Sequence, residues 1–237
     1  MGERDYELSE NLLIAYHDSA LGNAKSLLEE SYILLSNGKY ARAYFLAVAA
    51  MEETGKAYHA FATRGRNLDN SAVQKKMKGI FENHPQKIFG AFLGLFHFLP
   101  LLEKAKYAET MFDRAFNLID GREASMYVDA RIDNSIIDPL LLIRHIDAQE
   151  VYALATNCHK HMVVFVRETQ PVKTGAIEDK FLLIPLTKMM DKAKDDFSAF
   201  LLDSMRSDLE HFDFAVVAVR YHDAYYTKNK KYVSPDE

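Results

Sequence analysis

The side chains of this sequence that could bind or cleave a phosphate ester lie in three short blocks. The first block, Glu52-Glu53-Thr54-Gly55-Lys56, follows nine consecutive apolar residues on what the periodicity predicts to be one helix. Glycine inside a helix costs up to about 1 kcal/mol relative to alanine, so Gly55 predicts the close approach of another element. The alternative is a solvated helix face on which Glu52 and Lys56 form an ordinary i,i+4 ion pair.

The second block, His84-Pro85-Gln86-Lys87, predicts the first turn of a helix, because proline is tolerated at that position. An imidazole can give or take a proton near neutral pH, which makes His84 the best acid–base candidate. A lysine in the first turn opposes the helix dipole, but together with the free N–H groups it forms an anion site that suits phosphate. The alternative is that Lys87 points away into solvent.

The third block, 122–129, lies in a stretch between 119 and 139 that Asp-Gly, Asp-Asn and Asp-Pro dipeptides predict to be loop or broken helix. It contains Arg122, Tyr127 and Asp129. Arginine binds phosphate in a bidentate manner, tyrosine offers a stacking face and a hydroxyl, and aspartate can orient a partner or act as a base. The alternative is a loop that an Arg–Asp pair holds in place.

Other familiar site types are missing from the sequence. It contains no glycine-rich phosphate loop, no Gly-x-Ser-x-Gly motif and no Glu-x-x-His pair of the kind that di-iron bundles use. The run Cys158-His159-Lys160-His161 has metal-binding residue types, but no second ligand cluster accompanies it. We therefore expect no metal and no other cofactor.

The composition limits the class of protein. A net charge of −5 excludes a uniformly basic nucleic-acid coat, and only 10 Gly and 6 Pro disfavour turn-rich β folds. The single cysteine permits no internal disulfide and suits a reducing interior. The N-terminus lacks an apolar signal region, and the most apolar stretch, 88–102, falls short of a membrane span. We expect a cytoplasmic protein with no membrane partner.

Apolar residues recur at helical spacing through nearly the whole chain, which predicts an all-α bundle. The core is expected at 1–168, with 169–237 as a helical extension packed on it. The expected helices are 5–36 (one or two helices), 40–61, 71–81, 84–100, 101–118, 140–167, 185–203 and 206–226.

The three blocks also point to a family. Glu-Glu-x-Gly-Lys at 52–56, His-x-x-Lys at 84–87 and Arg-x4-Tyr-Val-Asp at 122–129 follow one another in an order and spacing that resembles the AbiV family of abortive-infection proteins. This family is a branch of the HEPN superfamily, and the resemblance covers about residues 10–165. It implies a HEPN-like helical bundle, a homodimer, and a toxin that arrests a phage-infected cell. The additional C-terminal helices that the sequence pattern predicts lie outside the resemblance.

Many HEPN relatives are metal-independent RNases, so the resemblance implies RNA as a substrate. Their usual signature, Arg-x4–6-His, occurs here once, as Arg206-x4-His211. Roughly one such match arises by chance in a chain of this composition, and this one lies outside the AbiV-like region. We therefore place the site on the three blocks. The catalytic candidates are His84, Arg122, Glu53 and Lys56, and the phosphate- or RNA-binding candidates are Lys87, Tyr127 and Asp129.

Each of these residue types has an expected role in the cleavage of RNA. His84 would be the acid–base group, Arg122 and Lys87 would hold phosphate oxygens, and Lys56 would add charge with Glu53 orienting it. Tyrosine in the third block would stack on a base or hydrogen-bond a phosphate, and its aspartate would orient the arginine or the histidine.

Two alternatives to an RNase remain open. The polar blocks could form a non-catalytic binding module that sequesters a nucleotide, an RNA, or a phage or host protein. They could also be solubilising charges on a helical scaffold.

Overall fold

The computed structural model describes residues 6–133, 135–208 and 212–233. Helices account for most of them, and the strands within these ranges are two antiparallel pieces of two residues each, so the predicted all-α class is confirmed. The elements in chain order are α1 (Glu10–Ser36), α2 (Tyr40–Thr63), α3 (Ser71–Glu82), α4 (His84–Phe98), α5 (Leu101–Ala124), β1 (Asp129–Ala130), β2 (Ile136–Ile137), α6 (Pro139–Leu142), α7 (His145–Glu168), α8 (Ala176–Leu183), α9 (Leu186–Ser207), α10 (Phe214–Ala224) and a short 3-10 helix, η1 (Tyr226–Lys228).

The chain forms two compact units. One runs from α1 to Gly65 and from Met77 to Val172, and the other comprises Arg66–Lys76 and the described residues from Lys173 onward. That 169–237 packs on the bundle as an extension stays a prediction.

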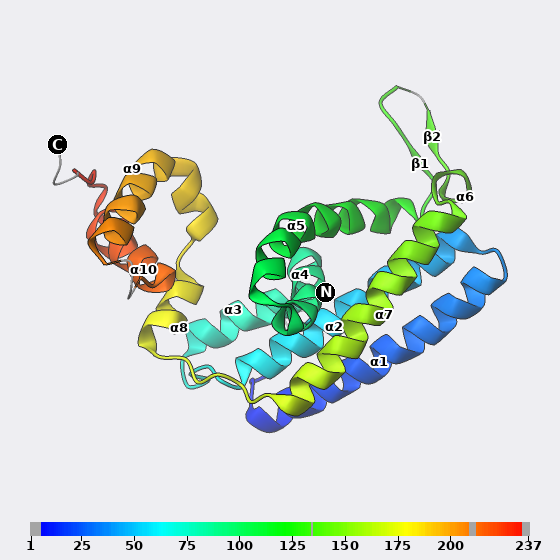
Figure 1. The fold of residues 1–237 in the computed structure, drawn as a ribbon, viewed down its shortest axis with the longest axis horizontal. Helices are drawn as coiled ribbons and strands as arrows, with labels where there is room; N and C mark the ends of the chain where they lie inside the picture. The colour runs from blue at the N-terminus through cyan, green and yellow to red at the C-terminus, as the bar shows by residue number, and fades with distance from the viewer. Residues whose placement is uncertain (1–5, 134, 209–211, 234–237) are drawn as a thin grey trace. The chain divides into compact units, whose positions relative to one another are not determined.

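Helix α2 is the central element of the first unit. It packs against α1, α4 and α7, and Figure 1 shows α1 and α7 running along it. Its buried face is rich in alanine, and the small side chains let the neighbouring helices approach closely. Within the core, Ser31 of α1 donates a buried hydrogen bond of 2.7 Å to the carbonyl of Ala43 in α2. From this position α2 contacts α1, α4, α5 and α7.

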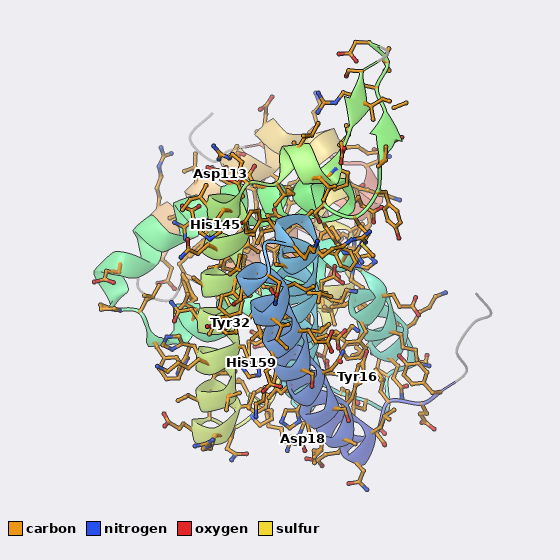
Figure 2. The ribbon with its side chains drawn as sticks, turned by 90° about the vertical axis from the view of Figure 1, so that its right-hand side faces the viewer. Tyr16, Asp18, Tyr32, Asp113, His145 and His159 are labelled. Atoms are coloured by element: carbon orange, nitrogen blue, oxygen red, sulfur yellow. The ribbon has the colours of Figure 1, made fainter. Side chains whose placement is uncertain are left out.

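Helices α1 and α7 also meet, and the side chains between them explain the metal-like run at 158–161. Cys158 is fully buried, and burial raises the pKa of its thiol to about 12. His159 lies 3.2 Å from the carbonyl of Leu21, and the ring of Tyr32 packs on that of Tyr152. Figure 2 labels Tyr32 and His159 where α1 and α7 lie side by side. Within the described residues, no three His, Cys, Asp or Glu side chains gather as a metal site would require.

The predicted helix over 101–118 was too short, because α5 continues to Ala124. Gly121 lies inside this helix, where a side chain at its position would come within 2.3 Å of the Tyr44 hydroxyl. Ser125 ends the helix: its hydroxyl donates to the Arg122 carbonyl at 2.7 Å, and its N–H donates to Gly121. The Asp-Gly pair therefore marks a close helix contact and not a loop, and Arg122 lies on the last helical turn.

The predicted helix over 140–167 is divided. Residues 139–142 form the single turn α6, and α7 begins only at His145. Asp147 accepts the N–H and the guanidinium of Arg144, which fixes the start of α7 and stops α6 from continuing into it. Before α6, the paired strands β1 and β2 form a ribbon that extends away from the helices (Figure 1).

The second unit departs most from expectation. Helix α8 is not among the predicted helices, and the helix predicted over 206–226 begins only at Phe214, where the side chain of Asp213 caps it. Arg206 belongs to α9, and His211 lies outside the described residues. A core of Phe197, Phe200, Val217 and Tyr221 holds this unit together. No helix in the described parts of either unit is long and apolar enough to span a membrane.

Candidate functional site

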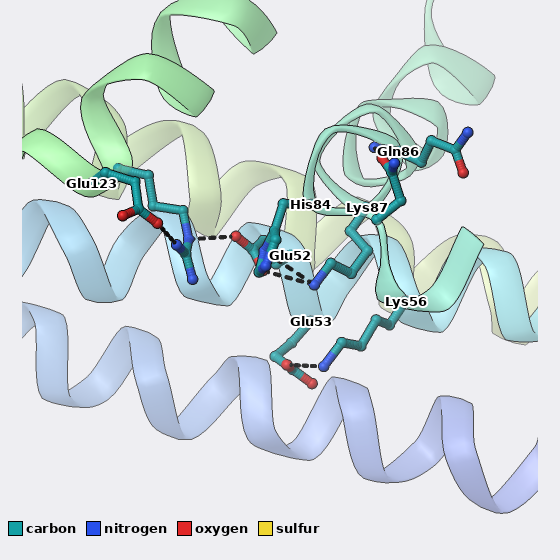
Figure 3. A network of polar contacts seen from close by, with 9 residues as sticks. Glu52, Glu53, Lys56, His84, Gln86, Lys87 and Glu123 are labelled. Carbon is teal, nitrogen blue, oxygen red and sulfur yellow. Dashed lines mark hydrogen bonds and ion pairs between the residues drawn. The ribbon is translucent and has the colours of Figure 1, made fainter. Parts of the chain in front are cut away.

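The carboxylate of Glu52 on α2 is the point at which three helices meet. Its Oε2 atom lies 2.7 Å from Nδ1 of His84 and 3.0 Å from Nζ of Lys87, both on α4 (Figure 3). Its Oε1 atom lies 2.7 Å from Nε of Arg122 on α5. We call Glu52, His84, Lys87 and Arg122 the Glu52 cluster. It contains one residue or more from each of the three sequence blocks.

Glycine brings α4 to this position. A side chain at position 55 would stand 1.6 Å from the Lys87 carbonyl oxygen, so only glycine permits this contact between α2 and α4. A side chain at position 90 would stand 2.7 Å from Nε2 of the His59 ring, and that nitrogen lies 2.9 Å from the Gln86 carbonyl. The close approach predicted from Gly55 is confirmed, and its consequence is that the first turn of α4 lies directly beside Glu52.

Two contacts place Arg122. The packing of Gly121 against Tyr44 brings the last turn of α5 onto α2, and the Arg122 guanidinium carbon lies 5.4 Å from the centre of the Phe45 ring. The guanidinium Nη1 also pairs with Glu123 at 2.7 Å. The distance between Arg122 Nε and Glu52 Oε1 is short, but the angles of this contact do not meet those of a hydrogen bond. Arg122 is therefore held to Glu52 mainly by charge.

Burial differs across the cluster in a way that matters for chemistry. The side chains of Glu52 and Lys87 are 7% and 6% exposed, whereas that of Arg122 is 20% and that of His84 is 49% exposed. Burial by itself would raise the pKa of Glu52. Hydrogen bonds from Lys87 and His84 and the charges of Lys87 and Arg122 outweigh it and hold that pKa below its usual value. Glu52 is thus an ionised internal anchor, and His84 is the member that solvent reaches most.

Lys87 does not point away from the protein, as the alternative interpretation had it. It points inward, and the negative charge beside it is the Glu52 carboxylate. Since Asn83 caps the start of α4 by accepting the N–H of Gln86, the helix start is well formed around this lysine. Lys87 lies in the first turn of α4, where the helix dipole disfavours a cation. The Glu52 carboxylate on α2 offsets this cost.

Glu53 and Lys56 form a separate pair. Lys56 Nζ lies 2.5 Å from Glu53 Oε1, and both side chains are only partly exposed (Figure 3). The i,i+4 ion pair of Glu52 with Lys56 is therefore replaced by this i,i+3 pair, because Glu52 faces the interior. Among the described residues, no contact joins Glu53 or Lys56 to the Glu52 cluster.

Tyr127 and Asp129 lie beyond the end of α5. The Tyr127 side chain is exposed, and Asp129 is an exposed residue of β1 whose carboxylate accepts the N–H of Ala130. Arg122 pairs with Glu52 and Glu123, so the alternative of an Arg122–Asp129 pair is wrong. Within the part of the chain that the structure describes, neither Tyr127 nor Asp129 contacts the Glu52 cluster.

Sequence reasoning gave Glu52 no role beyond a surface ion pair. The signal that could have revealed it is its place on the helix: Val48 precedes it by four residues and Gly55 follows by three, so all three lie on one face. Val48 and Gly55 are buried. A carboxylate on a buried face needs cationic partners, and these follow in the second and third blocks.

A comparison with protein-family models shows which family the chain belongs to. The sequence model of the AbiV family, a HEPN family, matches residues 12–160. The chain belongs to the AbiV family. The match includes every member of the Glu52 cluster and ends before α8, so the additional C-terminal helices lie outside it. No curated protein and no solved structure gives a significant match to the chain.

Proposed function

We propose that this AbiV protein arrests phage-infected cells by cleaving RNA at the Glu52 cluster without a metal ion. The observation that carries the proposal is the position of His84, which is half exposed, lies 3.3 Å from Nζ of Lys87 and shares the Glu52 carboxylate with Arg122. An imidazole that solvent can reach is suited to proton transfer, and nearby cations stabilise the negative charge that develops on a phosphate. Membership of an abortive-infection family supports the biological role.

The proposed reaction is the internal cleavage of an RNA strand. His84 removes the proton of a ribose 2′-hydroxyl while its oxygen attacks the adjacent phosphorus. The new O2′–P bond forms, the P–O5′ bond breaks, and the leaving 5′-oxygen takes up a proton. The products are a 2′,3′-cyclic phosphate and a 5′-hydroxyl end.

The two cations of the cluster have different parts in this reaction. Arg122 is partly exposed and would contact phosphate oxygens, whereas Lys87 is too deeply buried to do so and would act through its charge. Their two positive charges are matched by Glu52 within the cluster and by the exposed Glu123 beside it, so a phosphate would compete with Glu123 for Arg122. That Tyr127 stacks on a base, that Asp129 orients a neighbour, and that Glu53 and Lys56 line the RNA path stay predictions.

The test uses purified protein, an end-labelled RNA and EDTA. We expect the wild-type protein to cleave in the presence of EDTA, and His84→Ala to lose about 10²–10⁴-fold in rate. Arg122→Ala should lose activity as well, whereas Arg144→Ala should not, because Arg144 pairs with Asp147 at the exposed start of α7. Cleavage that persists unchanged in His84→Ala and Arg122→Ala would refute the proposal.

A second candidate function is a binding module that does not cleave. It is favoured by one observation: the cations of the cluster are already paired with Glu52, as they would be in a purely structural ion cluster. Such a module would act by sequestering a nucleotide, an RNA, or a phage or host protein. Binding of the labelled RNA that weakens steeply with added salt, with no product formed, would establish it in place of the RNase.

A homodimer is also part of the proposal, and family membership supports it. Sedimentation of the purified chain measures it directly. A mass of two chains is expected, and a single chain at micromolar concentration would remove this part of the proposal.

A further inference from the structure

The hydrogen atoms of the His84 ring can be placed from its surroundings. Its Nδ1 atom has two polar neighbours, Oε2 of Glu52 at 2.7 Å and Nζ of Lys87 at 3.3 Å. If Nδ1 carries a proton, it donates to Glu52. If Nδ1 is bare, it accepts from Lys87, and its lone pair then faces a carboxylate oxygen.

The two arrangements are not equivalent. Glu52 is ionised, because its partners hold its pKa below the usual value in spite of burial, so it can only accept. A short contact between a ring nitrogen and an ionised carboxylate requires the proton on nitrogen, and such charge-assisted bonds are the strong ones. The contact with Lys87 is longer, and the ammonium already donates to Glu52 at 3.0 Å. The arrangement that satisfies all three groups has the proton on Nδ1.

We infer that Glu52 is the positioning residue that holds His84 in its Nδ1–H tautomer and leaves Nε2 as the basic atom that faces solvent. In the described part of the chain, no residue hydrogen-bonds to Nε2, and the side chain is half exposed. The fixed tautomer follows from these contacts and from the ionised state of Glu52. The use of Nε2 to remove the proton of a 2′-hydroxyl rests on the proposed function.

The arrangement also explains why Glu52 is buried. It sits on the central helix and is joined to Lys87 as well as His84, so its own position is fixed by the packing of α2 against α4. A carboxylate held in this way restricts the rotation of the imidazole, and Nε2 keeps one direction toward solvent. A flexible surface carboxylate would not do so.

The direct test is nitrogen NMR of the protein with 15N-labelled histidine, at a pH well above the ordinary imidazole pKa. The His84 signals are assigned by their absence in His84→Gln. We expect the proton on Nδ1 and a bare Nε2. A bare Nδ1 with the proton on Nε2 would overturn the inference.

Glu52→Met removes the acceptor and leaves Lys87 as the polar neighbour of Nδ1. The tautomer should then shift toward Nε2–H, and kcat for RNA should fall by up to about 10⁴-fold with little change in KM. If the single variant does not fold, Glu52→Met with Lys87→Met keeps the site apolar and should also lose the Nδ1–H preference. An unchanged tautomer in either variant would contradict the role of Glu52.

Asp223→Asn is the matched control, because Asp223 pairs with Nδ1 of another histidine, His222, at 3.1 Å. This variant should change the signals of His222 and leave those of His84 as they are. Because the tautomer is measured without RNA, the two proposals can fail separately. A protein with His84 in the Nδ1–H form that never cleaves RNA would refute the proposed function and leave the tautomer assignment standing.

Discussion

Each unit of the protein contains a buried carboxylate, and the two have different partners. The Glu52 side chain is 7% exposed and the Asp179 side chain is 8% exposed. Asp179 accepts hydrogen bonds from the Arg66 guanidinium at 3.2 Å, the Thr174 hydroxyl at 2.9 Å and the Asn67 N–H at 3.3 Å. All three donors lie in loop segments next to the helices of the second unit.

Two carboxylates that are buried to a similar extent can therefore have different roles. Asp179 joins two loops through donors that cannot take part in proton transfer near neutral pH. Glu52 instead gathers two cations and an imidazole from α4 and α5, and the imidazole reaches solvent. A buried carboxylate that only closes loops stabilises the fold, whereas one that gathers titratable and cationic groups can also support chemistry.

The largest expected difference in stability between the two units comes from neutralising each buried carboxylate. Glu52→Gln should lower the free energy of unfolding by about 3–5 kcal/mol, because Lys87 is left buried without its counter-ion. Asp179→Asn should cost only about 1–3 kcal/mol, since Arg66 is more exposed and two of the donors are uncharged. Urea unfolding measures both.

A double variant sharpens this test. Glu52→Gln combined with Lys87→Met removes the charge on both sides, so it should recover most of the loss. Equal costs for the two single variants, or no recovery in the double variant, would contradict the account of the Glu52 cluster as a network of coupled charges.

Alanine in place of a glycine on α1 or on α2 should change the stability by a smaller amount, and in opposite directions. Gly55→Ala should destabilise the protein by about 1–3 kcal/mol, because its methyl group would overlap the Lys87 carbonyl and push α4 away. Gly22→Ala on α1 has open space around it and should stabilise by up to about 1 kcal/mol. Thermal unfolding compares the pair, and a neutral Gly55→Ala would show that α4 does not need this close contact.

The dependence of stability on pH gives the smallest of these effects. The pKa of Glu52 is lower in the folded chain than its ordinary value of 4.5, so ionised Glu52 contributes stability that is fully present above that value. This contribution should be lost as the pH falls below 4.5 and through the folded pKa. Urea unfolding of the wild type between pH 6 and 3, compared with Glu52→Gln, isolates it. Parallel curves for the two proteins would contradict the prediction.

Much of the bundle could be predicted because hydrophobic spacing and glycine placement act locally. The start of α4 follows from Asn83 and Pro85, and the contact of α2 with α4 follows from Gly55. The end of α5 could not be predicted in this way. An Asp-Gly pair is typical of a loop, and only the packing of Gly121 on Tyr44 keeps the helix intact there.

The candidate site was harder to predict than the fold. His84, Lys87 and Arg122 stand out by residue type, and the structure brings them together. Glu52 does not stand out by residue type, because Glu53 is adjacent to it, and the two differ only in that Glu52 shares a helix face with Val48 and Gly55. Local spacing favoured Lys56 as its partner, whereas α4 and α5 supply partners from distant parts of the sequence.

The central claim is that the histidine of the Glu52 cluster carries the chemistry. The most direct measurement is the rate of RNA cleavage in EDTA by His84→Gln and by His222→Gln, whose histidine also pairs with a carboxylate but lies in the second unit. The account predicts that His84→Gln loses cleavage and that His222→Gln cleaves like the wild type. Cleavage at the wild-type rate by His84→Gln would contradict it.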